Sequence, residues 1–234
     1  MNRLEPAAGF ELLDDPCAES ALVCESLRNI ARSNRWFGGA AAVRYGLRQA
    51  LIPDSRLPGS PDSLTFLDVG TGLGDLPRMA QAWARERGIS LRPVGVERHT
   101  AAAQLAYRTG LPVVVGEGAE LPIRDRGVDL VLLSQVAHHF APDAIVRLIR
   151  ECDRIARHAV ILSDLRRSEL AAVGFRLAGH ALRFDTDTMR DGVTSLRRGF
   201  SAESLTALLA RAGVSAHVSR RPGSRLVAVW RPGT

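Results

Sequence analysis

The chain of 234 residues contains no lysine, and all 31 of its basic residues are arginines. With 25 acidic residues, the formal net charge at pH 7 is +6. Aromatic residues make up only 5% of the chain, which leaves few rings for stacking on nucleotide bases. The arginines form short clusters, such as Arg166-Arg167 and Arg197-Arg198, and no long basic run. We therefore do not expect a nucleic-acid partner.

Cysteine is scarce, and long apolar segments are missing. The three cysteines are odd in number and lack CxxC spacing, which argues against a disulfide framework. No window approaches the roughly 18 uncharged apolar residues of a membrane span, and residues 1–6 lack the apolar core of a signal peptide. We therefore expect a soluble, cytoplasmic globular protein with no membrane span, formed by one domain with a small appendage. Its oligomeric state is left open, a homodimer included.

Two helices are predicted within residues 1–60. Apolar residues recur at helical spacing over residues 23–30 and again over 43–50, and the intervening residues 34–39 are predicted to turn because paired glycines break a helix. A loop rich in Pro, Ser and Gly follows at 53–61. We interpret residues 1–60 as a helical extension or lid, and residues 61–234 as the main domain.

From Leu64 onward the pattern alternates between strand and helix, which is typical of a doubly wound, mostly parallel α/β sheet. The predicted strands are 64–69, 91–97, 112–115, 128–133, 159–162, 215–219 and 225–230. Ser201 is predicted to cap a helix that stops at Gly213. The last two strands form a hairpin, which makes one strand antiparallel to the rest.

Residues 165–200 are hard to assign beyond a helix near 170–178, and we interpret them as an insertion on the substrate side. Polar candidates there are His180, Asp191 and Arg197. The run from Asp191 to Phe200 resembles a subgroup of bacterial methyltransferases associated with phenolic or polyketide substrates. A plain Asp-Gly turn followed by a strand with solvated arginines is the alternative.

The most informative motif follows the first predicted strand. Asp68 closes that strand, and glycines then occupy positions 70, 72 and 74 before a helix begins. Glycines at the carboxyl edge of such a sheet let the backbone approach a ligand closely. A dinucleotide motif would need glycine where Asp75 stands, and an acid at a helix start disfavours a pyrophosphate. The loop therefore favours a cationic ligand.

The pattern Asp68-x-Gly70-x-Gly72-x-Gly74 resembles the first motif of the class I S-adenosylmethionine-dependent methyltransferases, small-molecule type. The likeness covers about residues 64–231 and implies their Rossmann-like seven-stranded fold and S-adenosyl-L-methionine as cofactor. The cofactor-binding residues that it implies are Asp68, Gly70, Thr71, Gly72, Gly74, Asp75, Glu97, Arg98, Glu117, Gly118, Ser134 and Gln135.

Four of these residues receive specific roles from the resemblance. Glu97 ends the second strand, where an acid accepts both ribose hydroxyls. Glu117 lies in a stretch where an acid reaches the adenine amino group, although the family usually has Asp there and Ala where Gly118 stands. Ser134 and Gln135 follow the fourth strand, beside the methionine part of the cofactor.

Catalysis is assigned to His139 or His138, just past the fourth strand, where a base could deprotonate an acceptor hydroxyl. We prefer His139; the alternative is that these imidazoles only pack beneath the loop. No metal site is expected, because no Cys/His cluster has zinc spacing and adjacent histidines should point in divergent directions. Whether Asp164, Asp185 and Asp191 converge is left open.

The sequence thus predicts an enzyme that methylates a small molecule, with oxygen of an aromatic, quinone or polyketide-like acceptor as the favoured target. An amino-methylating N/D-P-P-Y motif is absent, since Ser134-Gln135-Val136-Ala137 takes its place. The alternatives are an RNA or protein methyltransferase, an NAD-dependent oxidoreductase, and a cofactor-binding regulator without catalysis.

Overall fold

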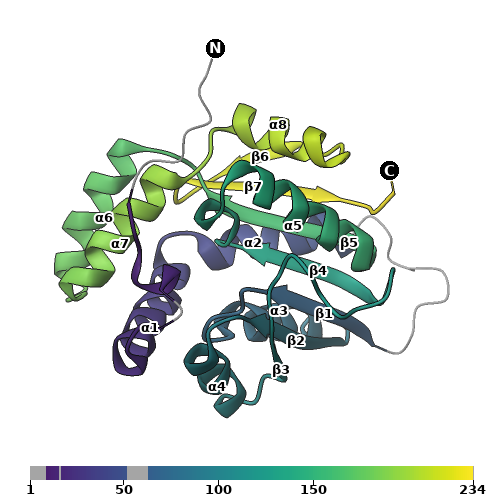
Figure 1. The fold of residues 1–234 in the computed structure, drawn as a ribbon, viewed down its shortest axis with the longest axis horizontal. Coiled ribbons are helices and arrows are strands. Elements are labelled where there is room, and N and C mark those ends of the chain that lie inside the picture. Colours follow the sequence, from purple (N-terminus) through teal and green to yellow (C-terminus); the bar gives the residue numbers. More distant parts are fainter. Residues whose placement is uncertain (1–8, 16, 52–62, 234) are drawn as a thin grey trace.

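A computed structural model describes residues 9–15, 17–51 and 63–233. The predicted domain boundary at residue 60, the loop at 53–61 and residues 1–6 lie outside the described residues. Within the described ranges, the fold is an α/β sandwich with an additional group of helices at one end of the sheet (Figure 1).

Seven strands form one sheet in the order β3-β2-β1-β4-β5-β7-β6. Their bounds are β1 Leu64–Val69, β2 Leu91–Glu97, β3 Val113–Val115, β4 Val128–Ser134, β5 Ala156–Leu165, β6 Val218–Arg221 and β7 Arg225–Trp230. Strands β1 to β5 pair in parallel, whereas β7 runs antiparallel to both β5 and β6. The predicted fold class, a doubly wound sheet with a C-terminal hairpin, is confirmed.

The helices are η1 Leu12–Asp14, α1 Ser20–Trp36, α2 Gly39–Leu51, α3 Asp75–Arg85, α4 Thr100–Arg108, η2 Ala137–His139, α5 Pro142–Ile155, α6 Glu169–Ala181, α7 Thr186–Arg198 and α8 Ala202–Ala212. The caps predicted for α8 are present: the Ser201 side chain accepts a hydrogen bond from the Ser204 N–H, and Gly213 adopts the left-handed conformation at the C-terminus.

Two apolar layers cover the sheet. Alternate strand residues such as Val131 and Leu133 pack with α5 and α8 on one face. Their neighbours Leu130 and Leu132 pack with α2 and α3 on the other face. Strand β4 is therefore buried on both sides, as its nearly continuous apolar sequence predicts. Helix α2 contributes directly to the core of the sheet.

Two local predictions were wrong. Residues 34–36 continue helix α1, and the chain turns only at Phe37 and Gly38. Asp191 and Gly192 lie inside helix α7, so they form neither a turn nor a strand. Helix α7 is capped by the Asp185 side chain, which accepts a 2.8 Å hydrogen bond from the Thr188 N–H. The packing of α7 against α6 outweighs the preference of Asp191-Gly192 for a turn.

Gly46 marks the tightest contact between helix α2 and the sheet, because a Cβ at this position would overlap the Ile161 side chain of β5. Gly46→Ala should therefore lower the free energy of unfolding by about 1–3 kcal/mol, although alanine is the better helix former. Chemical denaturation followed by circular dichroism measures the change. Gly174→Ala in α6 is the matched control, since its Cβ would meet no atom within 4 Å. This variant should gain roughly 0.5–1 kcal/mol. Equal effects at both positions would contradict the packing argument.

Candidate active site

A cavity of about 760 Å³ opens at the carboxyl edge of the parallel strands. The ends of β1, β2 and β4 form one wall, and residues from η1, α1, α6 and α7 form the other. Open α/β sheets bind their ligands at this edge, and the volume falls in the usual range of roughly 300–1,000 Å³ for ligand sites.

The glycine loop after β1 is held against the end of β2. The N–H groups of Gly70 and Thr71 donate to the Val96 carbonyl at 2.8 and 3.0 Å. Gly70 has a φ of 75°, and a Cβ there would overlap the Val136 side chain. Only glycine fits this close approach without strain. Gly74 does not line the cavity; it precedes α3 and packs against Leu111.

Glu97 is fixed by two backbone donors. Its Oε2 accepts the Gly72 N–H at 2.9 Å, and its Oε1 accepts the His99 N–H at 2.9 Å. Each carboxylate oxygen has two lone pairs, so both oxygens retain one for a ligand hydroxyl. Glu117 and Gly118 line the same end of the cavity.

Two further carboxyl groups lie beside the glycine loop. Burial raises the pKa of Asp68 to about 8, although the Thr71 hydroxyl donates to its Oδ2 at 2.8 Å. Burial also raises the pKa of Asp75, at the start of α3. In their ionised form, these carboxyls suit a cationic ligand and disfavour an anionic one.

A chain of hydrogen bonds crosses the floor of the cavity. Arg225 donates to the side-chain Oε1 of Gln135 at 2.5 Å. The side-chain Nε2 of Gln135 in turn donates to Asn34 Oδ1 at 2.6 Å. Asn34 then donates to Asp75 at 3.0 Å. Burial lowers the pKa of Arg225 to about 10, against the opposing charge of Asp164. This chain joins β7, the end of β4, α1 and α3 at one site.

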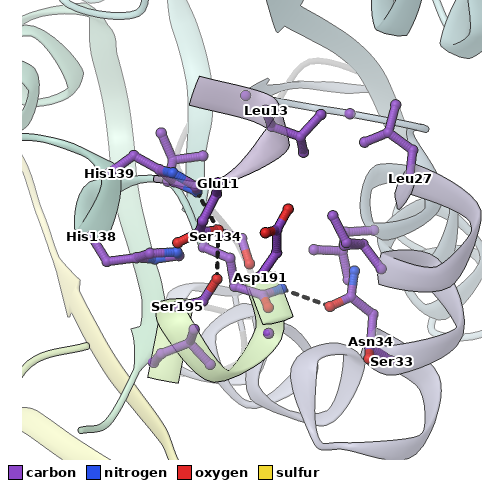
Figure 2. Close-up of a pocket in the computed structure, with 18 of the residues that line it drawn as sticks. Glu11, Leu13, Leu27, Ser33, Asn34, Ser134, His138, His139, Asp191 and Ser195 are labelled. Atoms are coloured by element: carbon purple, nitrogen blue, oxygen red, sulfur yellow. Dashed lines mark hydrogen bonds and ion pairs between the residues drawn. The ribbon is translucent and has the colours of Figure 1, made fainter. Parts of the chain in front are cut away.

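The two adjacent imidazoles lie side by side, with ring centroids 4.2 Å apart and planes inclined by 33°. The expectation that they would diverge was wrong, because the η2 turn places both rings on the cavity side of the chain (Figure 2). The Nδ1 of His138 lies 2.6 Å from Asp164, and the Nδ1 of His139 lies 2.8 Å from Asp14. Each ring is thus oriented by its own carboxylate.

The N-terminal residues 9–15 cover these histidines, a feature that the sequence analysis missed. Arg198 forms ion pairs with Glu11 at 3.2 Å and Asp14 at 2.8 Å, and Asp191 accepts the Leu12 N–H at 2.9 Å. Burial alone would raise the pKa of Asp14, but hydrogen bonds from His139, the Glu11 N–H and Arg198 hold it well below its usual range. The concentration of acids in this segment was the available signal, yet it did not indicate what they contact.

Residues 67–163 match the family model described as a methyltransferase domain. The match supports a class I S-adenosylmethionine-dependent methyltransferase, an enzyme with S-adenosylmethionine as its cofactor. The search of curated proteins found no match.

Solved structures of similar fold share little sequence identity with this chain. A SAM-dependent methyltransferase from Aquifex aeolicus is 17% identical, covers 82% of this chain and 98% of its own, and has a TM-score of 0.53. The magnesium protoporphyrin IX methyltransferase ChlM from Synechocystis PCC 6803, with bound SAH, is 15% identical, covers 84% of each chain and has a TM-score of 0.55. A chain in the complex between the Haloferax volcanii Trm112 methyltransferase activator and the putative methyltransferase is 16% identical, covers 97% and 100%, and has a TM-score of 0.58. At these identities, the likeness is one of fold.

The methyltransferase places its predicted substrate-side residues in different environments. Asp191 lines the cavity. His180 is exposed on α6, and Arg197 is exposed on α7, where it pairs with Glu169 at 3.2 Å. Neither His180 nor Arg197 lines the cavity, because both are on the outer faces of their helices. Asp164, Asp185 and Asp191 contact different partners and do not form a carboxylate cluster.

Several buried polar atoms of cavity-lining residues, Ser134 Oγ and His138 Nε2 among them, have no hydrogen-bond partner among the described residues. Such atoms are costly unless a ligand or water satisfies them. Together with the oriented Glu97 carboxylate and the acids near the loop, they fit a cofactor with hydroxyl groups and positive charge. None of the helices in the described ranges has the length and hydropathy that a membrane crossing requires.

Asp68 should give stability a specific pH dependence. Its pKa is raised to about 8 from 3.8, so between these values the folded chain holds a proton that the unfolded chain releases. The contribution of Asp68 to stability is therefore lost as pH rises through this window. Asp68→Asn removes the titration and can still accept the Thr71 hydroxyl. Relative to wild type, this variant should gain about 1 kcal/mol or more in unfolding free energy between about pH 5 and pH 8. The exposed Asp125→Asn serves as the control, and a pH-independent difference for Asp68→Asn would refute the assignment.

Proposed function

We propose that this methyltransferase transfers the methyl group to oxygen on a small aromatic, quinone or polyketide-like acceptor. The observation that carries the proposal is the buried pair of His138 and Asp164 on the wall of the cofactor cavity. A hydroxyl acceptor must lose its proton during transfer, and an oriented imidazole is suited to take it.

The proposed cofactor contacts use the atoms left available around the glycine loop. Both Glu97 oxygens would accept the ribose hydroxyls, and Glu117 would reach the adenine amino group. Asp68, Asp75, Ser134 and Gln135 would surround the methionine part, while the backbone from Gly70 to Gly72 would lie along the cofactor. Arg98 supports this site indirectly, since it donates to the Leu13 and Asp14 carbonyls at 3.0 and 3.3 Å.

The cofactor, when bound, supplies a methyl group on a positively charged sulfur leaving group. The protein's own contribution is then to orient the acceptor and remove its proton. Asp164 accepts hydrogen bonds from the Ala137 and Leu165 N–H groups at 3.0 and 2.7 Å. Burial would raise the pKa of Asp164, but the charge and hydrogen bond of His138 hold it below its usual value. In its neutral form, with Nδ1–H donating to Asp164, His138 has a free Nε2 lone pair. We assign the base to His138, which is more buried than His139.

The substrate side of the cavity supports an apolar, ring-containing acceptor. The rings of Phe37 and Phe175 meet edge to face with centroids 5.4 Å apart, and both line the cavity. Leu170 and Leu196 extend this apolar wall. Among the proteins of similar fold, ChlM is named for a macrocyclic small molecule, which agrees with this substrate class. Residues 9–15 and α1 form part of the same wall, and we propose that they act as a lid.

Cofactor binding should depend on the Glu97 carboxylate. Glu97→Gln replaces one acceptor oxygen by an amide that cannot accept, so we expect the affinity for S-adenosylhomocysteine to fall about 10–100-fold. Isothermal titration calorimetry measures this change directly. Glu120→Gln is the matched control, because Glu120 is exposed and does not line the cavity. Unchanged affinity in Glu97→Gln would contradict the proposed hydrogen bonds between Glu97 and the ribose hydroxyls.

Catalysis should depend on the His138 imidazole. His138→Gln should lower kcat about 10²–10⁴-fold while leaving the affinity for S-adenosylhomocysteine within about threefold. Mass spectrometry of a panel of phenols, hydroxyquinones and amines, incubated with labelled cofactor, measures the product that is heavier by one methylene. The exposed His180→Gln is the control, and the melting temperature of each variant checks its fold. Products from amines alone would contradict O-methylation. Full activity in His138→Gln would contradict the assignment of His138 as the base.

A further inference from the structure

Both imidazoles at the cavity leave the same ring nitrogen, Nε2, available. The Nδ1 atoms of His138 and His139 are held by Asp164 and Asp14, so hydrogen bonding of Nδ1–H to carboxylate leaves each Nε2 with a free lone pair. His138 is only 4% exposed, and its Nε2 has no hydrogen-bond partner among the described residues. In protein metal sites, a carboxylate commonly orients an imidazole through one ring nitrogen while the other ring nitrogen binds the metal ion.

Glu11 completes the group from the opposite side. Its Oε2 lies 4.0 Å from the Nε2 of His139, and one ligand atom from each of Glu11, His138 and His139 falls within 4.8 Å of the others. The Ser195 hydroxyl donates to the same Oε2 at 2.6 Å, which leaves that oxygen one lone pair. Figure 2 shows the Glu11 carboxylate between His139 and Ser195, with His138 beside it.

The spacing is close to that of a tetrahedral site. Ligand atoms about 2.1 Å from a zinc ion lie about 3.4 Å apart at tetrahedral angles. The atoms here need to approach by about 1 Å. Glu11 directly precedes the short helix η1, and both histidines are on the short helix η2. Two nitrogens and one carboxylate oxygen match the donor preference of zinc and neighbouring divalent transition metals more closely than that of magnesium or calcium.

The local charges also allow a cation. Glu11, Asp14 and Asp164 surround the group, and Arg198 is the opposing charge, paired with both Glu11 and Asp14.

We propose that Glu11, His138 and His139 form a binding site for one divalent transition metal ion of the zinc class, with its remaining coordination position toward the cofactor cavity. The ion would join the N-terminal segment to the η2 turn and so fasten one wall of the cavity.

The site also bears on the chemistry, in a step that rests on the proposed O-methylation. An acceptor hydroxyl coordinated to the ion would ionise at a lower pH, because the cation stabilises the oxyanion. The hydroxyl proton would pass to water, and the oxygen lone pair would form the new bond to the methyl carbon as the carbon–sulfur bond breaks. In the metal-bound enzyme, His138 acts as a ligand and no longer as the base.

Zinc binding itself provides the test, without cofactor or acceptor. We expect isothermal titration of the full chain, freed of metal with a chelator, to show one Zn²⁺ ion bound per chain. Glu11→Gln and His139→Ala should weaken binding by at least the roughly 10–100-fold that follows loss of a residue orienting a ligand. Asp14→Asn, which changes only such an orienting residue, should weaken it less.

His180→Ala removes an exposed histidine outside the cavity and is the matched control. Circular dichroism verifies that each variant folds. Absence of a one-equivalent site, or affinity unaffected by Glu11→Gln and His139→Ala, would overturn the proposal. If the zinc site is present and the phenol panel gives no product, the proposed function fails and the site stands. If product forms equally with and without chelator, the metal has no part in catalysis.

Discussion

The site depends on the backbone hydrogen bond from Gly72 to the Glu97 carboxylate. This bond joins the loop after β1 to the end of β2, two parallel strands that the sheet already holds in register. It aligns the carboxylate before a ligand arrives, so that its remaining lone pairs face the cavity. The hydrogen bond from Thr71 to the buried Asp68 and the positive φ of Gly70 shape the same loop. They help to keep it against the end of β2, where this contact forms.

The rest of the cavity is supplied by parts of the chain that are not in the sheet. Helices α6 and α7 lie together at one end of the molecule, with α1 and the N-terminal segment beside them (Figure 1). Ion pairs of Arg198 and the hydrogen bond of Asp191 connect these parts across the histidines. The sheet thus provides a fixed cofactor wall, while the opposite wall is assembled from polar contacts between separate segments.

This division explains what the sequence could predict. The role expected of Glu97 came from the family resemblance, whereas the strand pattern and the glycine spacing follow local rules, since each depends on residues within a few positions of one another. The partners of the histidines do not: Asp14 is 125 residues from His139, and Glu11 is 184 residues from Ser195. No local pattern specifies such pairings. The segment 165–200 has no clear pattern in sequence because its two helices pack largely against each other, as the close approach of Phe175 to Gly192 illustrates.

The hydrogen-bond chain from Arg225 through Gln135 and Asn34 to Asp75 has a further consequence for how the enzyme comes into being. Every donor in it points the same way, from the last strand toward the third helix. Its members come from early, middle and late in the chain, so the floor of the cavity cannot close until residue 225 has been synthesised and has inserted beside β5. A nascent chain that ends before residue 225 therefore lacks this hydrogen-bond chain, and that side of the cavity is complete only once β7 has joined the sheet.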